Sequence, residues 1–314
     1  LNAYHIGFIL GPCFNASGRL RTVELAFSLL QSTDREEAWR LAAELKDLND
    51  SRKEMTQKGV EQAAQLAEEA PWREDRVLLI PLQNCHESLT GIIAGRLREQ
   101  YNRPVLVFVR TEDGYKGSGR STEAYDMFGE LQKCRDLMTR FGGHPMAAGL
   151  TLPADNLEPL RSRLNQQCTL TPRDLAPVVH VDVPMPPSYI TEDLISQLSL
   201  LAPFGKGNTK PLFAFRRMRL LRASAIGRER QYLRLRLSDE QGAAFEAVYF
   251  GDGPAMAAEI ETFYGAGEWH RALAGQPGRI LLDVSYYPSL NEYNGGRTIQ
   301  LMLQDYRFPE EKMT

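Results

Sequence analysis

Near the start of the chain, the pattern of apolar residues predicts a long helix. Apolar residues recur at three- and four-residue spacing along residues 33–72, which is the period of one helix face. Thr33 followed by Glu36 is a capping-box pattern, and Pro71 ends the run. At 1.5 Å per residue such a helix would span about 50 Å, so we expect residues 33–72 to connect two bodies.

After this helix, short apolar runs alternate with helical patterns. Residues 77–82 and 104–110 predict buried strands, and residues 89–100 predict a helix between them, which is a β-α-β order. The predicted elements that follow are a glycine-punctuated segment at 114–121, a helix at 127–141, a turn at 142–145, a strand through Thr151 and a helix at 156–167. We therefore predict an α/β domain over residues 73–170 with a parallel or mixed sheet.

The last hundred residues have an all-β pattern. The predicted strands are residues 212–224, 232–238, 243–250, 280–287 and 298–307, with one helix near 254–263. Five strands and one helix in this length predict a small closed barrel of the OB type over residues 209–308. The proline-rich stretch 171–208, with a helix near 190–200, is predicted to be a crossover between the two domains.

Composition supports a folded, soluble protein. Of 314 residues, 43% are hydrophobic and 25% are charged. No apolar run approaches the roughly 20 residues that a membrane-spanning helix needs. The four cysteines form no C-x-x-C pair, which is typical of reduced thiols in the cytoplasm. Because the chain opens at Leu1 with no secretory signal and its first residues resemble the middle of a protein, we expect a cytoplasmic fragment.

Net charge is only −3, so any polyanion must bind a local patch. Such a patch lies between Arg216 and Arg236, where eight arginines less the single Glu229 leave +7. Strand alternation sends the intervening leucines to one face and Tyr232, Arg234 and Arg236 to the other. That second face could stack a base and hold phosphates. The alternative is an ordinary solvated barrel surface.

The glycine-rich run from Lys116 to Ser121 is a second candidate site. Its glycines would let backbone amides approach an anion, Ser118 could donate a hydroxyl, and Arg120 offers a bidentate fork to a phosphate. The alternative is a tight turn between a strand and a helix. The run is not a Walker loop, so the sequence gives no support for ATP chemistry.

Two histidines are candidates for chemistry. Gly142 and Gly143 precede His144, so the backbone can turn sharply there and place the imidazole at an accessible surface. His86 precedes a helix start and is either catalytic or an ordinary loop residue. All five histidines stand singly and no D-x-D motif is present, so a complete metal-hydrolase centre cannot be read from this chain.

Five strings, in this order and spacing, resemble the RecJ family of single-strand-specific exonucleases in the DHH phosphoesterase superfamily. They are residues 15–20 (NASGRL), 116–121 (KGSGRS), 140–149 (RFGGHPMAAG), 203–208 (PFGKGN) and 291–296 (NEYNGG). The resemblance covers nearly the whole chain. Where the family has a Trp-His pair and a glycine-rich helix start, this chain has Cys85 before His86, which leaves the role of His86 open.

The resemblance implies that this is the C-terminal, substrate-binding part of a 5′-to-3′ single-stranded-DNA exonuclease used in DNA repair and recombination. Two manganese or magnesium ions would be held by an upstream DHH domain, of which residues 1–32 are the tail. The fragment alone is then expected to bind no metal and to be inactive. The implied partners are single-stranded DNA, a single-strand-binding protein and a helicase, with no membrane.

The resemblance also implies roles for individual residues. Arg19, Ser118 and Arg120 would bind the 5′ phosphate, and His144 would reach the scissile phosphate. His86, Gly142 and Gly143 would belong to the active site, and the DNA-binding residues of the barrel region would be Lys206, Tyr232, Arg234 and Arg236. Two alternatives stay open: a non-catalytic nucleic-acid-binding module or scaffold of the same superfamily, and a small-molecule phosphoesterase.

Overall fold

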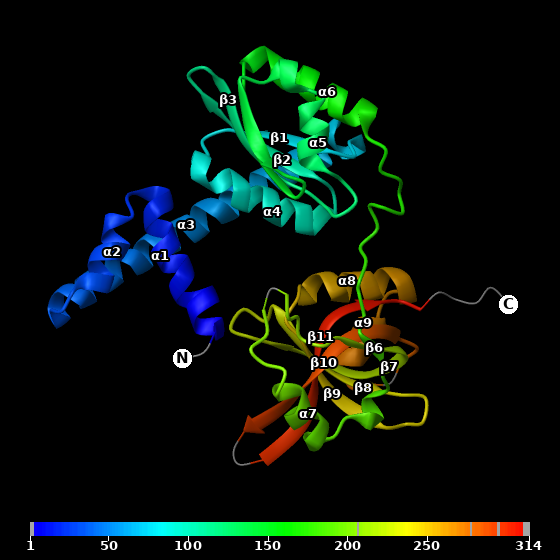
Figure 1. The fold of residues 1–314 in the computed structure, drawn as a ribbon. Helices are drawn as coiled ribbons and strands as arrows, with labels where there is room; N and C mark the ends of the chain where they lie inside the picture. The colour runs from blue at the N-terminus through cyan, green and yellow to red at the C-terminus, as the bar shows by residue number, and fades with distance from the viewer. Residues whose placement is uncertain (1–2, 206, 277, 294–295, 310–314) are drawn as a thin grey trace. The chain divides into compact units, whose positions relative to one another are not determined.

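The computed structural model describes residues 3–205, 207–276, 278–293 and 296–309. The chain divides after Pro177 into two compact units, residues 1–177 (unit 1) and 178–314 (unit 2) (Figure 1). Lys206, one of the predicted DNA-binding residues, lies outside the described residues.

Unit 1 begins with three short helices that the sequence only partly predicted. A π-helical segment, η1 (His5–Leu10), leads into α1 (Gly11–Leu20), and α2 (Glu24–Gln31) follows. Pro12 is compatible with α1 because it occupies the first turn, where its missing N–H is not needed. Large apolar side chains of this segment and of the next helix are exposed; they are Tyr4, Ile6, Phe8, Val23, Phe27, Leu30 and Trp39.

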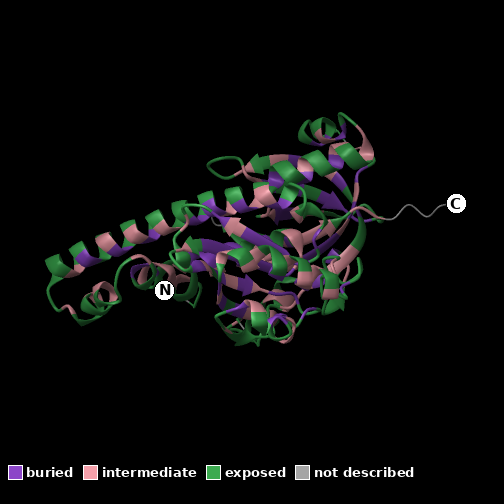
Figure 2. Ribbon diagram, turned by 90° about the horizontal axis from the view of Figure 1, so that it is seen from above, coloured by how far each residue is buried: buried purple, intermediate pink, exposed green. Residues whose placement is uncertain are grey.

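The predicted long helix is present as α3 (Arg35–Glu68), with 34 residues. Its N-cap is Asp34 rather than Thr33, because Oδ1 of Asp34 accepts a hydrogen bond from the backbone N–H of Glu37 at 2.7 Å. Its buried positions recur along one face, as Figure 2 shows, from Leu41 to Ala67. The first half packs on α1, and the second half packs on the α/β domain.

A five-stranded mixed sheet forms the centre of unit 1, as predicted. Its strands are β1 (Leu78–Leu82), β2 (Val105–Thr111), β3 (Gly114–Arg120), β4 (Arg140–His144) and β5 (Ala147–Leu152), in the order β1-β2-β3-β5-β4. Only β1 and β2 are parallel, joined by α4 (Thr90–Tyr101). Helices α3 and α4 cover one face, and α5 (Met127–Gln132) and α6 (Leu157–Gln167) cover the other (Figure 1).

The glycine-rich run is a strand, so its interpretation as an anion-binding loop or a turn is wrong. The side chains of β3 alternate, and Gly117 and Gly119 face the core. A Cβ on Gly117 would lie 2.5 Å from Cδ1 of Phe108, and one on Gly119 would collide with Sδ of Met127. These glycines therefore make room for core side chains instead of opening the backbone to a ligand.

The region around His144 also differs from the prediction. The predicted helix at 127–141 ends at Gln132, a 3₁₀ turn covers Arg135–Leu137, and residues 140–144 form β4. The turn falls after His144 instead of including it. Glycines are strong turn signals in a sequence, but here β4 is an edge strand that pairs with β5 through both glycines.

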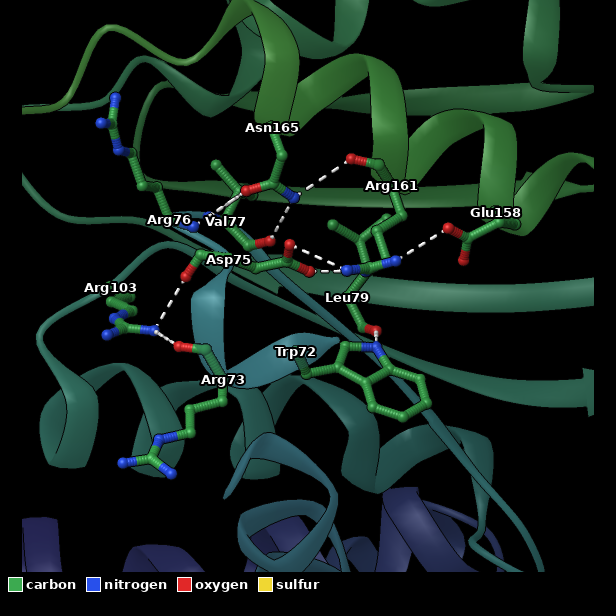
Figure 3. A network of polar contacts seen from close by, with 10 residues as sticks. All are labelled: Trp72, Arg73, Asp75, Arg76, Val77, Leu79, Arg103, Glu158, Arg161 and Asn165. Atoms are coloured by element: carbon green, nitrogen blue, oxygen red, sulfur yellow. Dashed lines mark hydrogen bonds and ion pairs between the residues drawn. The ribbon is translucent and has the colours of Figure 1, made fainter. Parts of the chain in front are cut away.

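A polar network fixes the segment before β1 on α6 (Figure 3). Arg161 of α6 donates Nε to Asp75 at 2.5 Å and Nη2 to the same carboxylate at 2.9 Å. Asn165 accepts the backbone N–H groups of Arg76 and Val77 and donates to the carbonyl of Val77. The network holds the start of the sheet, and it shares no residue with the candidate sites described below.

Unit 2 is a closed five-stranded barrel, as the sequence predicts for an OB fold. The strands are β7 (Phe213–Ile226), β8 (Tyr232–Ser238), β9 (Ala244–Tyr249), β10 (Leu281–Tyr293) and β11 (Gly296–Arg307). Their order is β7-β8-β9-β11-β10, and β10 closes on β7. The parallel pair is β9 with β11. The short strand β6 (Val183–Pro184) extends the sheet beside β7.

Three helices accompany the barrel. Helix α7 (Glu192–Ser199) precedes it, and α8 (Gly253–Tyr264) and α9 (Glu268–Leu273) lie between β9 and β10. The sequence predicted α7 and α8 but missed α9, which has only six residues. The barrel core includes Leu235 and Tyr286, both fully buried.

Candidate functional site

Strands β3, β5 and β4 bring the predicted residues of unit 1 onto one face. Arg120 pairs with Ala147, which in turn pairs with His144. Directly paired residues share a face, so Arg120 and His144 lie on the same face, about 10 Å apart along two strand spacings. Two residues further along the same strands, and on the same face, Ser118 pairs with Gly149, and Gly149 pairs with Gly142.

An open groove of about 310 Å³ crosses these strands. Two of its floor positions, Gly142 and Gly149, carry no side chain, and nothing lies within 4 Å of where a Cβ on Gly142 would stand. Lys116 and Arg140 line the groove on either side of Thr151. Gly143 serves a different need, because a Cβ there would lie 2.7 Å from Cα of Ala148 on the neighbouring strand.

Arg120 and Arg19 meet at one end of this face. Arg120 donates Nη1 to the carbonyl of Gly119 at 2.7 Å, and Arg19 donates Nη1 to the carbonyl of Ser88 at 2.8 Å. Burial and the nearby charge of Arg19 lower the pKa of Arg120. Within the described residues, neither guanidinium has a carboxylate partner. Two neighbouring cations without a counter-charge favour binding of an anion.

Ser118 stands two residues before Arg120 on β3, so the two side chains share a face of the sheet. Its Oγ is 3.1 Å from Oγ1 of Thr90, at the start of α4, and Thr90 donates to the carbonyl of Glu87 at 2.8 Å. Lys116, on the same face, is held by an ion pair with Glu87 at 3.0 Å. The hydroxyl of Ser118 is therefore positioned by α4 rather than by the loop geometry that the sequence suggested.

The two candidate histidines occupy different settings. The Nδ1 atom of His86 accepts the backbone N–H of Ser88 at 3.3 Å and lies 2.8 Å from its Oγ, so the ring helps to order the loop whose carbonyl Arg19 contacts. His144 is exposed at the end of β4, and its imidazole makes no hydrogen bond or ion pair with the described part of the chain. Its imidazole is thus free to contact a ligand.

Neither unit offers a metal centre among the residues that the structure describes, because no three His, Cys, Asp or Glu side chains gather there as a metal site requires. Over the same residues, no helix combines the length and apolar character needed to cross a bilayer.

The predicted alternation on β8 is observed. Leu233, Leu235 and Leu237 are buried, while Arg234 and Arg236 are exposed. A second groove, of about 300 Å³, is lined by Arg222, Ser224, Arg234, Leu235, Arg236 and Glu246. Of the eight arginines between residues 216 and 236, only Arg217 makes an ion pair within the described chain, with Glu240 at 3.5 Å. The groove itself holds three arginines and one carboxylate, Glu246, so a net positive charge faces a bound polyanion.

An aromatic pair stands near this groove. Tyr232 and Phe250 pack edge to face, with ring centroids 5.1 Å apart, and 57% of Phe250 is exposed. Tyr232 belongs to the same strand as Arg234 and Arg236 and alternates with the buried leucines. Phe250 was missed by the sequence reasoning, which assigned it to the predicted strand 243–250. The sequence signal that could have identified Phe250 is its position directly after β9 (Ala244–Tyr249), where a large aromatic residue no longer belongs to the strand.

Comparison with known proteins identifies relatives for both units. Two protein-family models match the chain, a DHHA1 domain over residues 74–170 and a RecJ OB domain over residues 181–305. The single-stranded-DNA-specific exonuclease RecJ of Bacillus subtilis is 32% identical over 308 residues, which cover 97% of this chain and 37% of that protein. The same-named protein of Escherichia coli is 32% identical over 318 residues, covering 97% and 51%.

Solved structures show the same fold. RecJ from Thermus thermophilus in complex with Mg²⁺ superposes with a TM-score of 0.77 at 24% identity, and its complex with Mn²⁺ with 0.77 at 25%. Each match covers 98% of this chain, but only 44% and 42% of those chains. The chain therefore spans about half or less of the relatives that it matches.

Proposed function

Because the chain is homologous to the C-terminal region of the RecJ exonucleases and carries their DHHA1 and OB domains, we propose that it is the substrate-binding part of a 5′-to-3′ single-stranded-DNA exonuclease. The complete enzyme would act in DNA repair and recombination. Its proposed partners are single-stranded DNA, a single-strand-binding protein and a helicase, in the cytoplasm.

One observation carries the proposal for unit 1: the uncompensated pair Arg19 and Arg120 beside the hydroxyl of Ser118. A terminal phosphate carries more negative charge than an internal phosphodiester, so this pair would select a phosphorylated 5′ end. His144, on the same face, would donate a hydrogen bond to the phosphate under attack. The glycine-floored groove lies next to Arg120 and His144 on the same strands and leaves room for the nucleic-acid strand.

The barrel groove supports a second role, binding along the strand. Arg234 and Arg236 would contact phosphates, and Tyr232 with Phe250 would stack bases, as in other single-strand binders. Such contacts are tolerant of sequence because every base has an aromatic face. A ligand small enough for one groove would gain little from the other unit, so the arrangement favours a polymer over a small-molecule phosphoesterase.

Metal chemistry would belong to residues outside this chain. In the proposed enzyme, an upstream DHH domain holds Mg²⁺ or Mn²⁺, which would activate water for attack on the phosphodiester. Residues 1–32 would be the tail of that domain, residues 33–72 the connector, 73–170 the DHH-associated domain, 171–208 the crossover and 209–308 the OB domain. The exposed apolar side chains from Tyr4 to Leu30 support a contact of that tail with further protein.

The test measures binding of the purified chain to short oligothymidylates that differ only at the 5′ end. We expect a 5′-phosphorylated strand to bind more tightly than a 5′-hydroxyl strand, and Arg120→Gln to remove the difference. We also expect no nucleotide release with Mn²⁺ present. Equal binding of both ends would favour the non-catalytic module, and robust digestion would show that the catalytic centre lies within this chain.

A further inference from the structure

The cationic face of unit 1 extends beyond the residues proposed to hold the terminal phosphate. Two further arginines continue it: Arg52 of α3 lies near Arg19, and Arg96 of α4 lies near Arg52. Arg52 donates Nε to the amide oxygen of Asn49 at 3.1 Å, and Arg96 donates Nη1 to the amide oxygen of Gln57 at 3.2 Å. Both partners are neutral, so neither hydrogen bond offsets the charge of its guanidinium.

The carboxylates closest in sequence to Arg52 are engaged elsewhere. Asp50 pairs with Lys46 at 2.8 Å and with Lys53 at 2.9 Å, and Glu54 pairs with Lys58 at 2.7 Å. Arg52 and Arg96 make no ion pair within the described residues. The two acidic residues nearest to Arg52 are thus matched to lysines, and Arg52 is left without a counter-charge among the described residues.

The four arginines stand on adjoining elements of unit 1, since Arg120 of β3 lies against Gly91 of α4 and Arg96 of α4 contacts Gln57 of α3. Arg120 interacts with Arg19, and Arg52 interacts with both Arg19 and Arg96. Burial and these two positive neighbours lower the pKa of the half-buried Arg52. His144 lies on the outer strand β4, whereas α4 packs on β2 and β3 and α3 packs on β1. Arg96 and Arg52 therefore belong to elements on the other side of β3 from His144.

We infer that Arg52 and Arg96 form a second phosphate subsite, which receives a phosphoryl group beyond the 5′-terminal phosphate, as in a 5′-triphosphate. The inference rests on the proposed function. It assumes that Arg19, Ser118 and Arg120 bind the 5′-terminal phosphate and that the scissile phosphate lies near His144. The strand then leaves the first subsite toward His144. Only a group attached to the 5′ phosphate itself can extend toward Arg52.

The test compares one oligothymidylate carrying a 5′-hydroxyl, a 5′-monophosphate or a 5′-triphosphate, with binding to the full chain measured by fluorescence anisotropy of a 3′ label. We expect the triphosphate to bind about tenfold more tightly than the monophosphate, the gain of one charge-assisted contact. Arg52→Gln and Arg96→Gln should each reduce that gain and leave the ratio of monophosphate to hydroxyl unchanged. Arg98→Gln, on α4 but ion-paired with Glu99 at 3.2 Å, is the matched control and should change neither ratio.

Three results separate the possibilities. Equal affinity for triphosphate and monophosphate, with the monophosphate still preferred over the hydroxyl, overturns the second subsite and leaves the proposed function intact. Equal weakening of all three ligands by Arg52→Gln and Arg96→Gln also overturns it, because the arginines would then contact an internal phosphate of the strand. No preference for any phosphorylated end rejects the proposed function itself. Because Arg96 is exposed, Arg96→Gln keeps the test available if Arg52→Gln unfolds the chain.

Discussion

The guanidinium of Arg120 lies against Gly91, so closely that a Cβ on Gly91 would stand 2.8 Å from Nη2. Gly91 is in the first turn of α4, and its missing side chain provides the space in which the head of Arg120 rests. The position of a proposed phosphate ligand is therefore set by a glycine on a neighbouring helix.

Gly91→Ala is expected to displace the head of Arg120 with little effect on folding, because the end of a flexible side chain can move. The preference for a 5′-phosphorylated strand should fall about tenfold, the loss of one charge-assisted contact. Binding assays with both strand ends and a thermal melt measure the two effects. Gly95→Ala is the control, since its Cβ would only reach ordinary contact, 4.0 Å from Cγ of Arg120. If Gly91→Ala leaves the preference for a 5′-phosphorylated strand unchanged, Arg120 does not bind the 5′ phosphate.

Gly119→Ala should destabilise unit 1 by about 1–3 kcal/mol, the usual cost of overpacking a core. The new methyl group would point into the space that Met127 occupies. Urea denaturation followed by circular dichroism measures the loss. Gly142→Ala is the matched control, because its Cβ would meet open space over the groove, and it should leave the unfolding midpoint nearly unchanged. Similar unfolding midpoints for the two variants would contradict the conclusion that Gly119 faces the core.

Arg234→Gln and Arg236→Gln should each reduce the salt dependence of binding to single-stranded DNA. Each lost phosphate contact lowers the slope of log K against log salt by about 0.7 for a single strand. Titrations at several salt concentrations measure the slope. Arg217→Gln should leave it unchanged, because Arg217 is the arginine of this region that pairs with a carboxylate, Glu240. If the slope changes equally in all three variants, the arginines attract the strand through their summed charge, and the groove makes no specific phosphate contacts.

Phe250→Ala should weaken binding of single-stranded DNA by roughly 1–3 kcal/mol, the contribution of one stacked base. Because Phe250 is 57% exposed, the substitution should cost little stability. Phe263→Ala tests an equally accessible ring elsewhere in the unit, 50% exposed and stacked on Phe308. A matching loss in both variants would point to a general effect on the fold.

Tyr101 gives unit 1 a predictable dependence on high pH. Burial, followed by the neighbouring Glu68, raises the pKa of Tyr101 to about 12 from the ordinary 10.0. The folded state therefore holds this proton more tightly than the unfolded state. The stabilisation is complete below pH 10 and is lost as the pH rises toward 12. Tyr101→Phe should flatten the fall in the free energy of unfolding across this window, and an unchanged slope would exclude the contribution of Tyr101.

The sequence predicted the elements whose apolar period is long and regular. The 34-residue α3, the β-α-β start of the sheet and the alternation in β8 all follow from side-chain spacing alone. The prediction was wrong at glycines, because a glycine can either allow an unusual backbone conformation or leave space for a neighbouring side chain, and the sequence does not distinguish the two. From the sequence, Gly117 and Gly119 suggest either a backbone open to an anion or a tight turn. The reason for them is the volume of Phe108 and Met127, which only the folded sheet brings opposite them.

The candidate site was predicted only in part, because some of its residues are distinguished only by their surroundings in the folded chain. Ser118, Arg120 and His144 came from strings, and strand pairing then places all three on one face. Arg52, Arg96 and Phe250 carry no local motif. Arg52 and Arg96 stand in helices rich in other charges, and what distinguishes them is that, among the described residues, no acidic partner reaches them in three dimensions. Phe250 differs from other aromatic residues only in its exposure and its contact with Tyr232.

The barrel's strand order also bears on how the protein is made. The strand β11 lies between β9 and β10, so each of those two strands lacks one of its two neighbours until residues 296–307 have left the ribosome. A nascent or truncated polypeptide ending before this point would expose two unpaired backbone edges, which are templates for aggregation. Productive folding of unit 2 must therefore wait until β11 has been translated.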